Sequence, residues 1–196
     1  MNHGEFARAK EIFELRSAKG DANAMNDLGW IYQYGLGVEA SYAQALFWYQ
    51  KAAALHNTAA TINAGDMYRF GRGVPVDDAK AQAYYRTVGS EHDPSVSYEL
   101  GFMYQHGLGV PIDFRKAKDL YWSAQSDGYG AAANQLGYMH EHAQGFPLSL
   151  KAAYCWYVTA TAQGFDAAAS HLAKLEAQGV SLSPGGGDCD VINRLD

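Results

Sequence analysis

Histidine and glutamate residues whose types suit metal binding lie between positions 106 and 142. His106 and His142 stand 36 residues apart, and His140 and Glu141 lie beside the second of them. Two imidazoles and a carboxylate are ligands that zinc accepts. The zinc motif of two histidines four residues apart with an intervening glutamate is absent, and a two-residue step turns about 200° around a helix, so His140 and His142 should point to different sides. We therefore interpret them as polar surface residues and expect no metal and no cofactor.

Other catalytic signatures are also missing. The chain has no Ser-x-x-Lys, no Gly-x-Ser-x-Gly and no Gly-Lys-Ser/Thr phosphate loop. Gly185-Gly186-Gly187 lacks the lysine and the following helix that a phosphate site needs. The carboxylates of Asp77 and Asp78 fall where a helix should begin, and capping is enough to explain them. A hydrolase or metal-dependent enzyme is therefore the least favoured alternative, and we predict that the protein is not an enzyme.

The chain has two cysteines, Cys155 and Cys189. Cys155 falls in a predicted helix, where a free thiol commonly serves as a small buried apolar residue. The first residues show no hydrophobic signal region and no apolar run reaches membrane-spanning length, so we predict a cytoplasmic protein, although a chain that had lost a leader would look the same. A Cys155–Cys189 bridge is the alternative, but it is disfavoured in a reducing compartment.

These residues belong to a chain that repeats itself every 36 positions. A pair ending in glycine recurs at Leu28-Gly29, Ala64-Gly65, Leu100-Gly101 and Leu136-Gly137, and Gly-x-Gly-Val recurs at 35–38, 71–74 and 107–110. Residues 36 apart form further columns of one type, such as Ala45, Ala81, Ala117 and Ala153, and Tyr49, Tyr85, Tyr121 and Tyr157. A fixed period of this length predicts a stacked helical solenoid, which favours binding of another chain over catalysis.

Each repeat should form two helices, which we call helix A and helix B. In the first repeat Ala24, Leu28 and Tyr32 recur at helical spacing and define helix A, which should end at the glycines of residues 35–37 because glycine adopts positive φ readily. Helix B should bury Ala45, Trp48, Tyr49, Ala52 and Ala53 and begin in every repeat at an N-cap residue: Ser41, Asp77, Asp113 and Ser149. In the fourth repeat Ala143-Gln144-Gly145-Phe146-Pro147 replaces the Gly-x-Gly-Val loop, so we expect altered loop geometry there.

The period divides the chain into four full repeats and two ends. The repeats are predicted at 21–56, 57–92, 93–128 and 129–164. Residues 5–20 match helix B, so residues 1–20 should form an N-terminal capping helix. Residues 165–177 match helix A and should form a C-terminal one. Residues 178–196 form a tail that contains glycine and proline, which we interpret as loosely held, with anchoring through Val191 and Ile192 as the alternative.

The pattern resembles the Sel1-like repeat family, a branch of the tetratricopeptide-like solenoids. Besides the two glycine motifs, it is carried by Lys80-Ala81, Lys116-Ala117, Trp48-Tyr49 and Trp156-Tyr157, and it extends over residues 5–177. The resemblance implies an all-α fold, a right-handed α/α superhelix of four helical hairpins with half-repeat caps. It also implies use as an adaptor in protein complexes, commonly bacterial, without naming one partner.

The charge of the chain narrows the partner class. The net charge is −6 and the hydrophobic content is 48%, which is normal for a folded domain. Acidic chains of this kind do not favour nucleic acid, and a basic protein partner is mildly favoured, although solubility alone explains the charge equally well. We therefore predict a protein or peptide partner, with no nucleic-acid and no membrane binding.

The predicted binding surface is the side of helix A that faces away from helix B. Positions offset by about 200° from the buried stripe should line the concave surface of the superhelix. Aromatic side chains interleaved with polar groups suit recognition. The candidate partner-binding residues are Trp30, Tyr34, Asp66, Arg69, Phe70, Tyr98, Phe102, His106, Tyr138, Glu141 and His142. The alternative is that the rings pack on neighbouring A helices and complete the core.

The favoured function is an interaction scaffold whose A helices bind a peptide or helix of a partner protein. Trp30, Phe102 and Tyr138 would act as anchors together with Tyr34 and Phe70. A second hypothesis is an immunity or inhibitor protein that neutralises a cognate bacterial toxin, because an acidic surface would steer a basic toxin.

Overall fold

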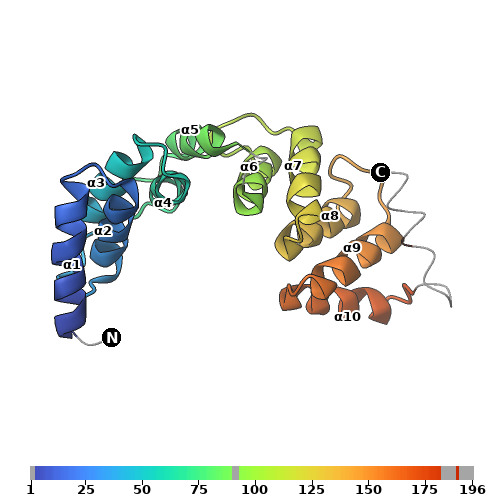
Figure 1. The fold of residues 1–196 in the computed structure, drawn as a ribbon. Helices are drawn as coiled ribbons and strands as arrows, with labels where there is room; N and C mark the ends of the chain where they lie inside the picture. The colour runs from blue at the N-terminus through green and yellow to red at the C-terminus, as the bar shows by residue number, and fades with distance from the viewer. Residues whose placement is uncertain (1–2, 90–92, 182–188, 190–196) are drawn as a thin grey trace. The chain divides into compact units, whose positions relative to one another are not determined.

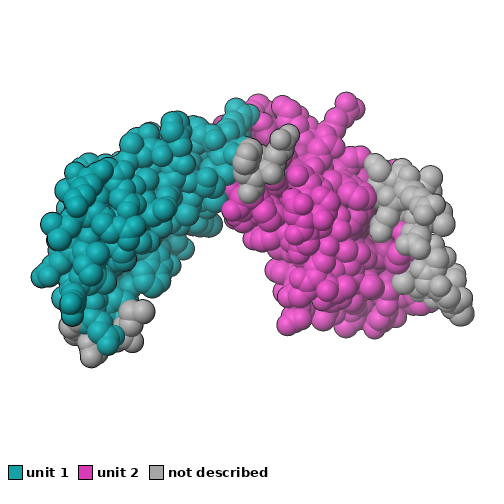
Figure 2. Space-filling model, viewed as in Figure 1, with its two compact units in different colours: residues 1–89 teal, residues 90–196 magenta. Residues whose placement is uncertain are grey.

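The structure is a computed structural model that describes residues 3–89, 93–181 and 189. In these ranges all regular structure is helical, with α-helices α1–α10 and one 3₁₀ turn, as the all-α prediction required. The chain divides into two compact units, residues 1–89 and residues 90–196, which Figure 2 shows in different colours. The 36-residue period does not predict this division.

Unit 1 holds two helical hairpins and one preceding helix. α2 and α3 form the first hairpin, α4 and α5 form the second, and α3 packs on α4 (Figure 1). α1 packs on α2, in the place that a helix B of a preceding repeat would take. The bounds are α1 (His3–Ser17), α2 (Ala22–Tyr34), α3 (Tyr42–Ala53), α4 (Thr58–Arg69) and α5 (Asp78–Val88).

Unit 2 repeats this arrangement and ends on a single helix A. α6 pairs with α7, α8 pairs with α9, and α7 packs on α8. The last helix, α10, follows a short 3₁₀ turn and packs on α9. The bounds are α6 (Pro94–His106), α7 (Phe114–Ser126), α8 (Gly130–Glu141), α9 (Leu150–Ala162), η1 (Asp166–Ala168) and α10 (Ala169–Ala177).

Each helix B begins at the predicted N-cap residue. The cap side chain accepts a hydrogen bond from the backbone N–H three residues further on, over 2.9 Å at Asp77 and 3.1 Å at Asp113, and Ser41 and Ser149 do the same. These hydrogen bonds from backbone N–H groups hold the pKa values of the Asp77 and Asp113 carboxyl groups below the ordinary value for aspartate. The N-cap prediction is therefore confirmed, because these side chains satisfy backbone donors that have no partner inside the helix.

The fourth loop keeps the geometry of the others, so the prediction of altered geometry is wrong. Ala143 adopts a φ of 53°, close to the 64° of Gly35 at the equivalent position. The N–H of the next residue then donates back to the helix in both loops, from Leu36 to Ile31 O over 3.0 Å and from Gln144 to Met139 O over 2.8 Å. Alanine can occupy this left-handed conformation at a cost of about 1 kcal/mol, and these helix-ending bonds support it.

The glycine of each Leu/Ala-Gly pair lies against the tyrosine ring of the following helix B. A Cβ atom added to Gly65 would lie 2.7 Å from Tyr85 Cε1, and one added to Gly137 would lie 2.8 Å from Tyr157 Cε1. The tyrosine rings of this column are fully buried: Tyr49, Tyr85, Tyr121 and Tyr157. The two columns are therefore complementary, because the missing side chain on helix A makes room for the ring on helix B.

Candidate functional site

In unit 1 three large rings lie exposed on the outward side of the A helices. Trp30 and Tyr34 of α2 are 49% and 57% exposed, and Phe70, which ends α4, is 50% exposed. α2 and α4 are neighbours, since the Asn63 side chain of α4 donates to Asn26 Oδ1 of α2 over 3.0 Å. We call the surface that carries Trp30, Tyr34 and Phe70 the unit 1 A face.

Two arginines flank the ring of Phe70. The guanidinium carbons of Arg69 and Arg72 lie 5.5 and 5.2 Å from its centroid, within the range of a cation–π interaction. Arg69 Nη1 also lies 3.4 Å from Asp78 Oδ1 of α5. Arg69 is therefore held between the ring and the next helix, whereas Arg72 is in the exposed loop beyond α4.

Asp66, the acidic candidate of this face, is tied to the core. The hydroxyl group of buried Tyr85 donates to Asp66 Oδ1 over 2.6 Å. Burial raises the pKa of Asp66 even though this hydrogen bond favours the charged form. The carboxyl group thus satisfies a buried tyrosine, a role that the sequence analysis did not foresee.

In unit 2 the equivalent rings of α6 are only partly exposed. Tyr98 and Phe102 both pack against the hydrophobic core of this unit. Tyr98 lies 5.8 Å from the ring of Tyr121 and 5.3 Å from that of Tyr129, measured between centroids. Tyr98 therefore matches the alternative interpretation, in which rings of this column complete the core. His106 is exposed at the end of α6, and its ring lies 4.2 Å from that of Phe102.

The histidines of the fourth repeat separate as the helical spacing predicts. His140 is buried and stacks on Phe146 with 3.9 Å between centroids, whereas His142 is exposed and stacks on Tyr138 at 3.9 Å. The Tyr138 carbonyl oxygen accepts a hydrogen bond from His142 Nδ1 over 2.9 Å. Among the described residues no three His, Cys, Asp or Glu side chains are grouped so that they could hold a metal ion.

Glu141 joins three elements of unit 2. Its Oε2 accepts a hydrogen bond from the Tyr157 hydroxyl of α9 over 2.8 Å, and its Oε1 accepts one from Lys174 Nζ of α10 over 2.6 Å. His171 Nδ1 of α10 lies 3.8 Å from Oε2. Burial alone would raise the pKa of Glu141, but the bonds from Lys174 and Tyr157 outweigh it and lower the pKa. Glu141 is therefore engaged within the fold.

Three of the buried helix B tyrosines have their partner in one polar column of helix A, at positions 33, 69, 105 and 141, of which only Arg69 and Glu141 were predicted as binding residues. Tyr49 donates to Gln33 Oε1 over 2.9 Å and Tyr121 donates to Gln105 Oε1 over 2.6 Å, each across 16 residues. The second repeat has Arg69 at this position, which cannot accept, and Asp66 accepts from Tyr85 instead. The available signal was the constant separation of 16 residues between a polar acceptor and a tyrosine.

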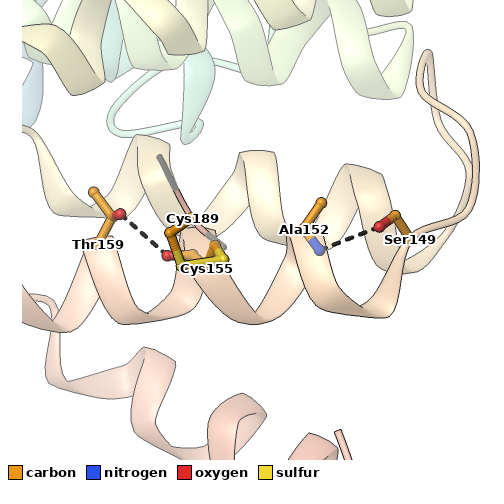
Figure 3. Close-up of a disulfide and its surroundings, with 5 residues drawn as sticks. All are labelled: Ser149, Ala152, Cys155, Thr159 and Cys189. Carbon is orange, nitrogen blue, oxygen red and sulfur yellow. Dashed lines mark hydrogen bonds between the residues drawn. A yellow bond between two sulfur atoms is a disulfide. The ribbon is translucent and has the colours of Figure 1, made fainter. Parts of the chain in front are cut away.

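Cys155 forms a disulfide with Cys189, which corrects the expectation of a free thiol (Figure 3). The two Cα atoms are 5.3 Å apart, and Cys155 is fully buried on α9. The alternative anchor, Val191 and Ile192, lies outside the described residues. The cysteine pair was visible in the sequence, but the cytoplasmic interpretation counted against a bond between them.

The sequence matches a single family model four times, at residues 22–57, 58–87, 94–124 and 130–165, and the model describes the Sel1 repeat. The chain belongs to the Sel1 repeat family. Sel1 repeats generally mediate interactions between proteins. A comparison with curated proteins found no match. Within the described ranges, no helix of this Sel1 protein is long and apolar enough to cross a membrane.

Solved Sel1 structures resemble this chain over most of its length. A protective antigen, c5321, present in uropathogenic Escherichia coli strains has a TM-score of 0.81 and 31% identity over 92% of this chain. The chain spans only 38% of that protein. A Sel1 repeat protein from Oxalobacter formigenes has a TM-score of 0.77 and 25% identity over 98% of this chain and 82% of its own.

An immunity protein, Pa5087, from Pseudomonas aeruginosa is a more distant neighbour. Its TM-score is 0.53 and its identity is 25%, over 84% of this chain and 61% of its own.

Proposed function

We propose that this Sel1 protein is an interaction scaffold that binds a segment of a partner protein through the outward sides of its A helices. The observation that carries the proposal is the exposure of Trp30, Tyr34 and Phe70 on the unit 1 A face. Tryptophan and tyrosine bury a large area while freezing few rotatable bonds, and they dominate the energetics of many interfaces. These three residues are the proposed anchors, and Arg69 and Arg72 beside Phe70 set the local charge.

Two ring pairs of unit 2 are proposed as a second contact area. His106 beside Phe102 and His142 beside Tyr138 end successive A helices of this unit with an aromatic and an imidazole ring. Phe102 packs on the core and Glu141 is engaged by Tyr157 and Lys174. The exposed members are therefore the two histidines, and Tyr138, like Phe102, is partly buried.

Charge supports a basic partner segment at unit 2. Residues 1–89 contain nine lysines and arginines and nine aspartates and glutamates, whereas residues 90–196 contain six and twelve. The whole net charge of −6 is therefore contributed by unit 2. An acidic domain of this kind steers basic partners during association, and the effect weakens with salt.

The test compares two double variants of unit 1 that remove similar rings from different surfaces. Tyr34→Ala/Phe70→Ala removes two rings of the A face. Tyr42→Ala/Phe47→Ala removes two rings of α3 that are 47% and 45% exposed. Partners are recovered from a bacterial lysate with wild-type protein, and each affinity is then measured with purified partner after circular dichroism has shown that both variants fold.

We expect the A-face variant to lose at least about 30-fold in affinity, which corresponds to about 2 kcal/mol, and the α3 variant to bind as wild type does. Loss of binding in the α3 variant with retention in the A-face variant would overturn the assignment.

We propose as a second candidate that the protein neutralises a toxin, because one structural neighbour is an immunity protein. Expression of a toxin encoded beside this gene, with and without the chain, tests it. Growth rescued by wild type and lost in the A-face variant would support immunity, whereas failure of rescue by folded protein would reject it. A hydrolase or metal-dependent enzyme stays the least favoured alternative.

We also propose that the protein resides in an oxidising compartment. The Cys155–Cys189 disulfide supports this location over the cytoplasm that the sequence analysis predicted, since structural disulfides persist mainly outside reducing compartments.

A further inference from the structure

The position of Cys155 is exposed in the other repeats. Its equivalents 36 residues apart are Phe47, Ala83 and Asp119, and all three side chains are exposed on helix B. Cys155 is fully buried and bonded to Cys189. The outer surface of α9 is therefore covered at a point where the earlier B helices face solvent, and residue 189 is what the disulfide places there.

α10, which precedes Cys189 in the sequence, packs against fewer helices than α2, α4 and α8 do. α2, α4 and α8 each pack between a preceding and a following helix, whereas α10, among the described residues, packs mainly on α9 and the adjoining η1. The residue of α10 equivalent to the helix-packing glycines is Ala173, which is exposed, and no tyrosine follows Tyr157 in the sequence. Docking of α10 therefore depends mainly on its interface with α9.

α10 contacts the fourth helix A, α8, through Lys174, and it contacts α9 through a ring stack and a further hydrogen bond. Lys174 Nζ donates to Glu141 Oε1 over 2.6 Å, and the His171 ring stacks on that of Tyr157 with 4.6 Å between centroids. The Tyr154 hydroxyl of α9 also donates to Glu176 Oε1 over 2.8 Å. Exposed hydrogen bonds and ion pairs of this kind contribute little by themselves. Any motion of α10 would nevertheless change the surroundings of Glu141, one of the candidate partner-binding residues.

We propose that the Cys155–Cys189 disulfide is a redox-sensitive clasp that holds α10 against α9 and keeps Glu141 paired with Lys174. The bond closes a loop with a sequence separation of 34 residues that contains the whole of α10. Closing such a loop limits how far α10 can separate from α9, because Cys189, which follows α10 in the sequence, is then bonded to α9. The claim that the clasp regulates the A-helix surface rests on the proposed function. The claim that the disulfide holds α10 against α9 does not depend on that function.

The redox step is an ordinary thiol–disulfide exchange with a dithiol reductant. One thiolate of the reductant attacks a sulfur of the disulfide, and its second thiolate completes the exchange. The S–S bond breaks, two electrons and two protons pass to Cys155 and Cys189, and the reductant is oxidised to its own cyclic disulfide. The protein then carries two thiols, and α10 is held only by its contacts with α9 and Glu141.

Hydrogen exchange of the full-length chain tests the clasp. Protein purified without reductant is first alkylated and weighed, and the expected mass is that of a chain with no alkylated cysteine. Amide exchange of residues 169–177 is then compared with and without the dithiol. We expect exchange in α10 to rise at least tenfold on reduction, while exchange in α2 and α3 stays constant.

The matched control is Cys155→Ser/Cys189→Ser, in which α10 should exchange fast with and without the reductant. Two results would overturn the clasp: alkylation of both cysteines in protein treated with an oxidised dithiol, or equal protection of α10 in the oxidised and reduced chains. Neither result involves a partner, so failure of the clasp is distinguishable from failure of the scaffold, which the Tyr34→Ala/Phe70→Ala variant tests.

Discussion

Tyr157 and Glu141 are joined by a hydrogen bond of 2.8 Å that connects the core of the fourth hairpin to its outward surface. In the second hairpin Tyr85 makes the equivalent bond to Asp66 over 2.6 Å. The two carboxyl groups nevertheless have pKa values shifted in opposite directions. Burial raises the pKa of Asp66, whereas Lys174 and Tyr157 lower that of Glu141 against the effect of burial.

These opposite shifts predict opposite pH dependences. Protonated Asp66 stabilises the fold, so its contribution is complete below the pKa of the unfolded chain and is lost as the pH rises through the raised pKa of the folded state. Ionised Glu141 stabilises the fold, so its contribution is present above the pKa of the unfolded chain and is lost as the pH falls through the lowered pKa. Asp66→Asn should therefore be at least as stable as wild type at pH 7, and Glu141→Gln should be less stable by about 1 kcal/mol.

The measurement is urea unfolding of both variants at pH 7, 5 and 3. Both amides keep an acceptor for the tyrosine hydroxyl, and both differences from wild type should shrink towards about pH 3, where carboxyl groups are protonated. A destabilised Asp66→Asn variant whose deficit stays constant with pH would contradict the assignment.

Gly101→Ala should destabilise the protein by about 2 kcal/mol, because overpacking of a core forces neighbouring side chains to move. The added Cβ atom would lie 2.9 Å from the ring of Tyr121 and 3.3 Å from the carbonyl oxygen of Ala117. Thermal or urea unfolding measures the effect. The control is Ala173→Gly in the same column of α10. Ala173 is exposed, so the loss should be about 0.5–1 kcal/mol, from helix propensity alone. Equal stability of Gly101→Ala and wild type would show that the Tyr121 ring can shift to accommodate the added methyl group without loss of stability.

Ala143→Gly should stabilise the protein by about 0.5–1 kcal/mol, since glycine removes the cost of a left-handed residue that carries a Cβ atom. Ala143 holds a φ of 53° and is exposed, so no packing is lost. Ala54→Gly is the matched control: Ala54 has a φ of −62°, and glycine there should destabilise. Chemical denaturation of both variants gives the comparison, and a destabilised Ala143→Gly variant would show that the methyl group makes a needed contact.

Tyr121→Phe should cost about 1–2 kcal/mol, because Gln105 is buried and loses the hydroxyl donor. Tyr34→Phe removes the hydroxyl of a ring that is mostly exposed, and its stability should match wild type. The measurement compares the unfolding midpoints of Tyr121→Phe and Tyr34→Phe with that of wild type, at constant protein concentration. Comparable losses in both would mean that the buried bond has no special contribution.

The repeat pattern predicted much of the local structure correctly, for identifiable reasons. Ser41, Asp77, Asp113 and Ser149 cap helix B because capping depends on the cap side chain and the three residues after it. The hairpins follow from apolar spacing within one repeat. The same local reasoning failed at Ala143, where it assumed that the loop needs glycine, although the helix-ending bonds from Gln144 and the residues around it maintain the turn.

The candidate site was predicted less completely, because exposure depends on neighbours outside a repeat. Trp30, Phe102 and Tyr138 are equivalent by sequence, but Trp30 is exposed and Phe102 packs on the core of unit 2. Asp66 and Glu141 are equally polar by sequence, yet each is the acceptor for a buried tyrosine. The repeat pattern located the candidate positions on helix A. It could not show which of these side chains pack on the core or bond to other residues of the chain.

The sequence by itself determined the all-α class, the hairpins, the helix starts and membership of the Sel1 repeat family, because these depend on spacing and on interactions between residues close in the chain. Only the tertiary structure decided which rings of the A helices reach solvent and which carboxylates the buried tyrosines engage. It alone decided that Cys155 meets Cys189 across 34 residues, since a disulfide requires Cα atoms within about 7 Å of each other, and here they are 5.3 Å apart. Such a distance is set by tertiary packing, and no spacing within one repeat encodes it.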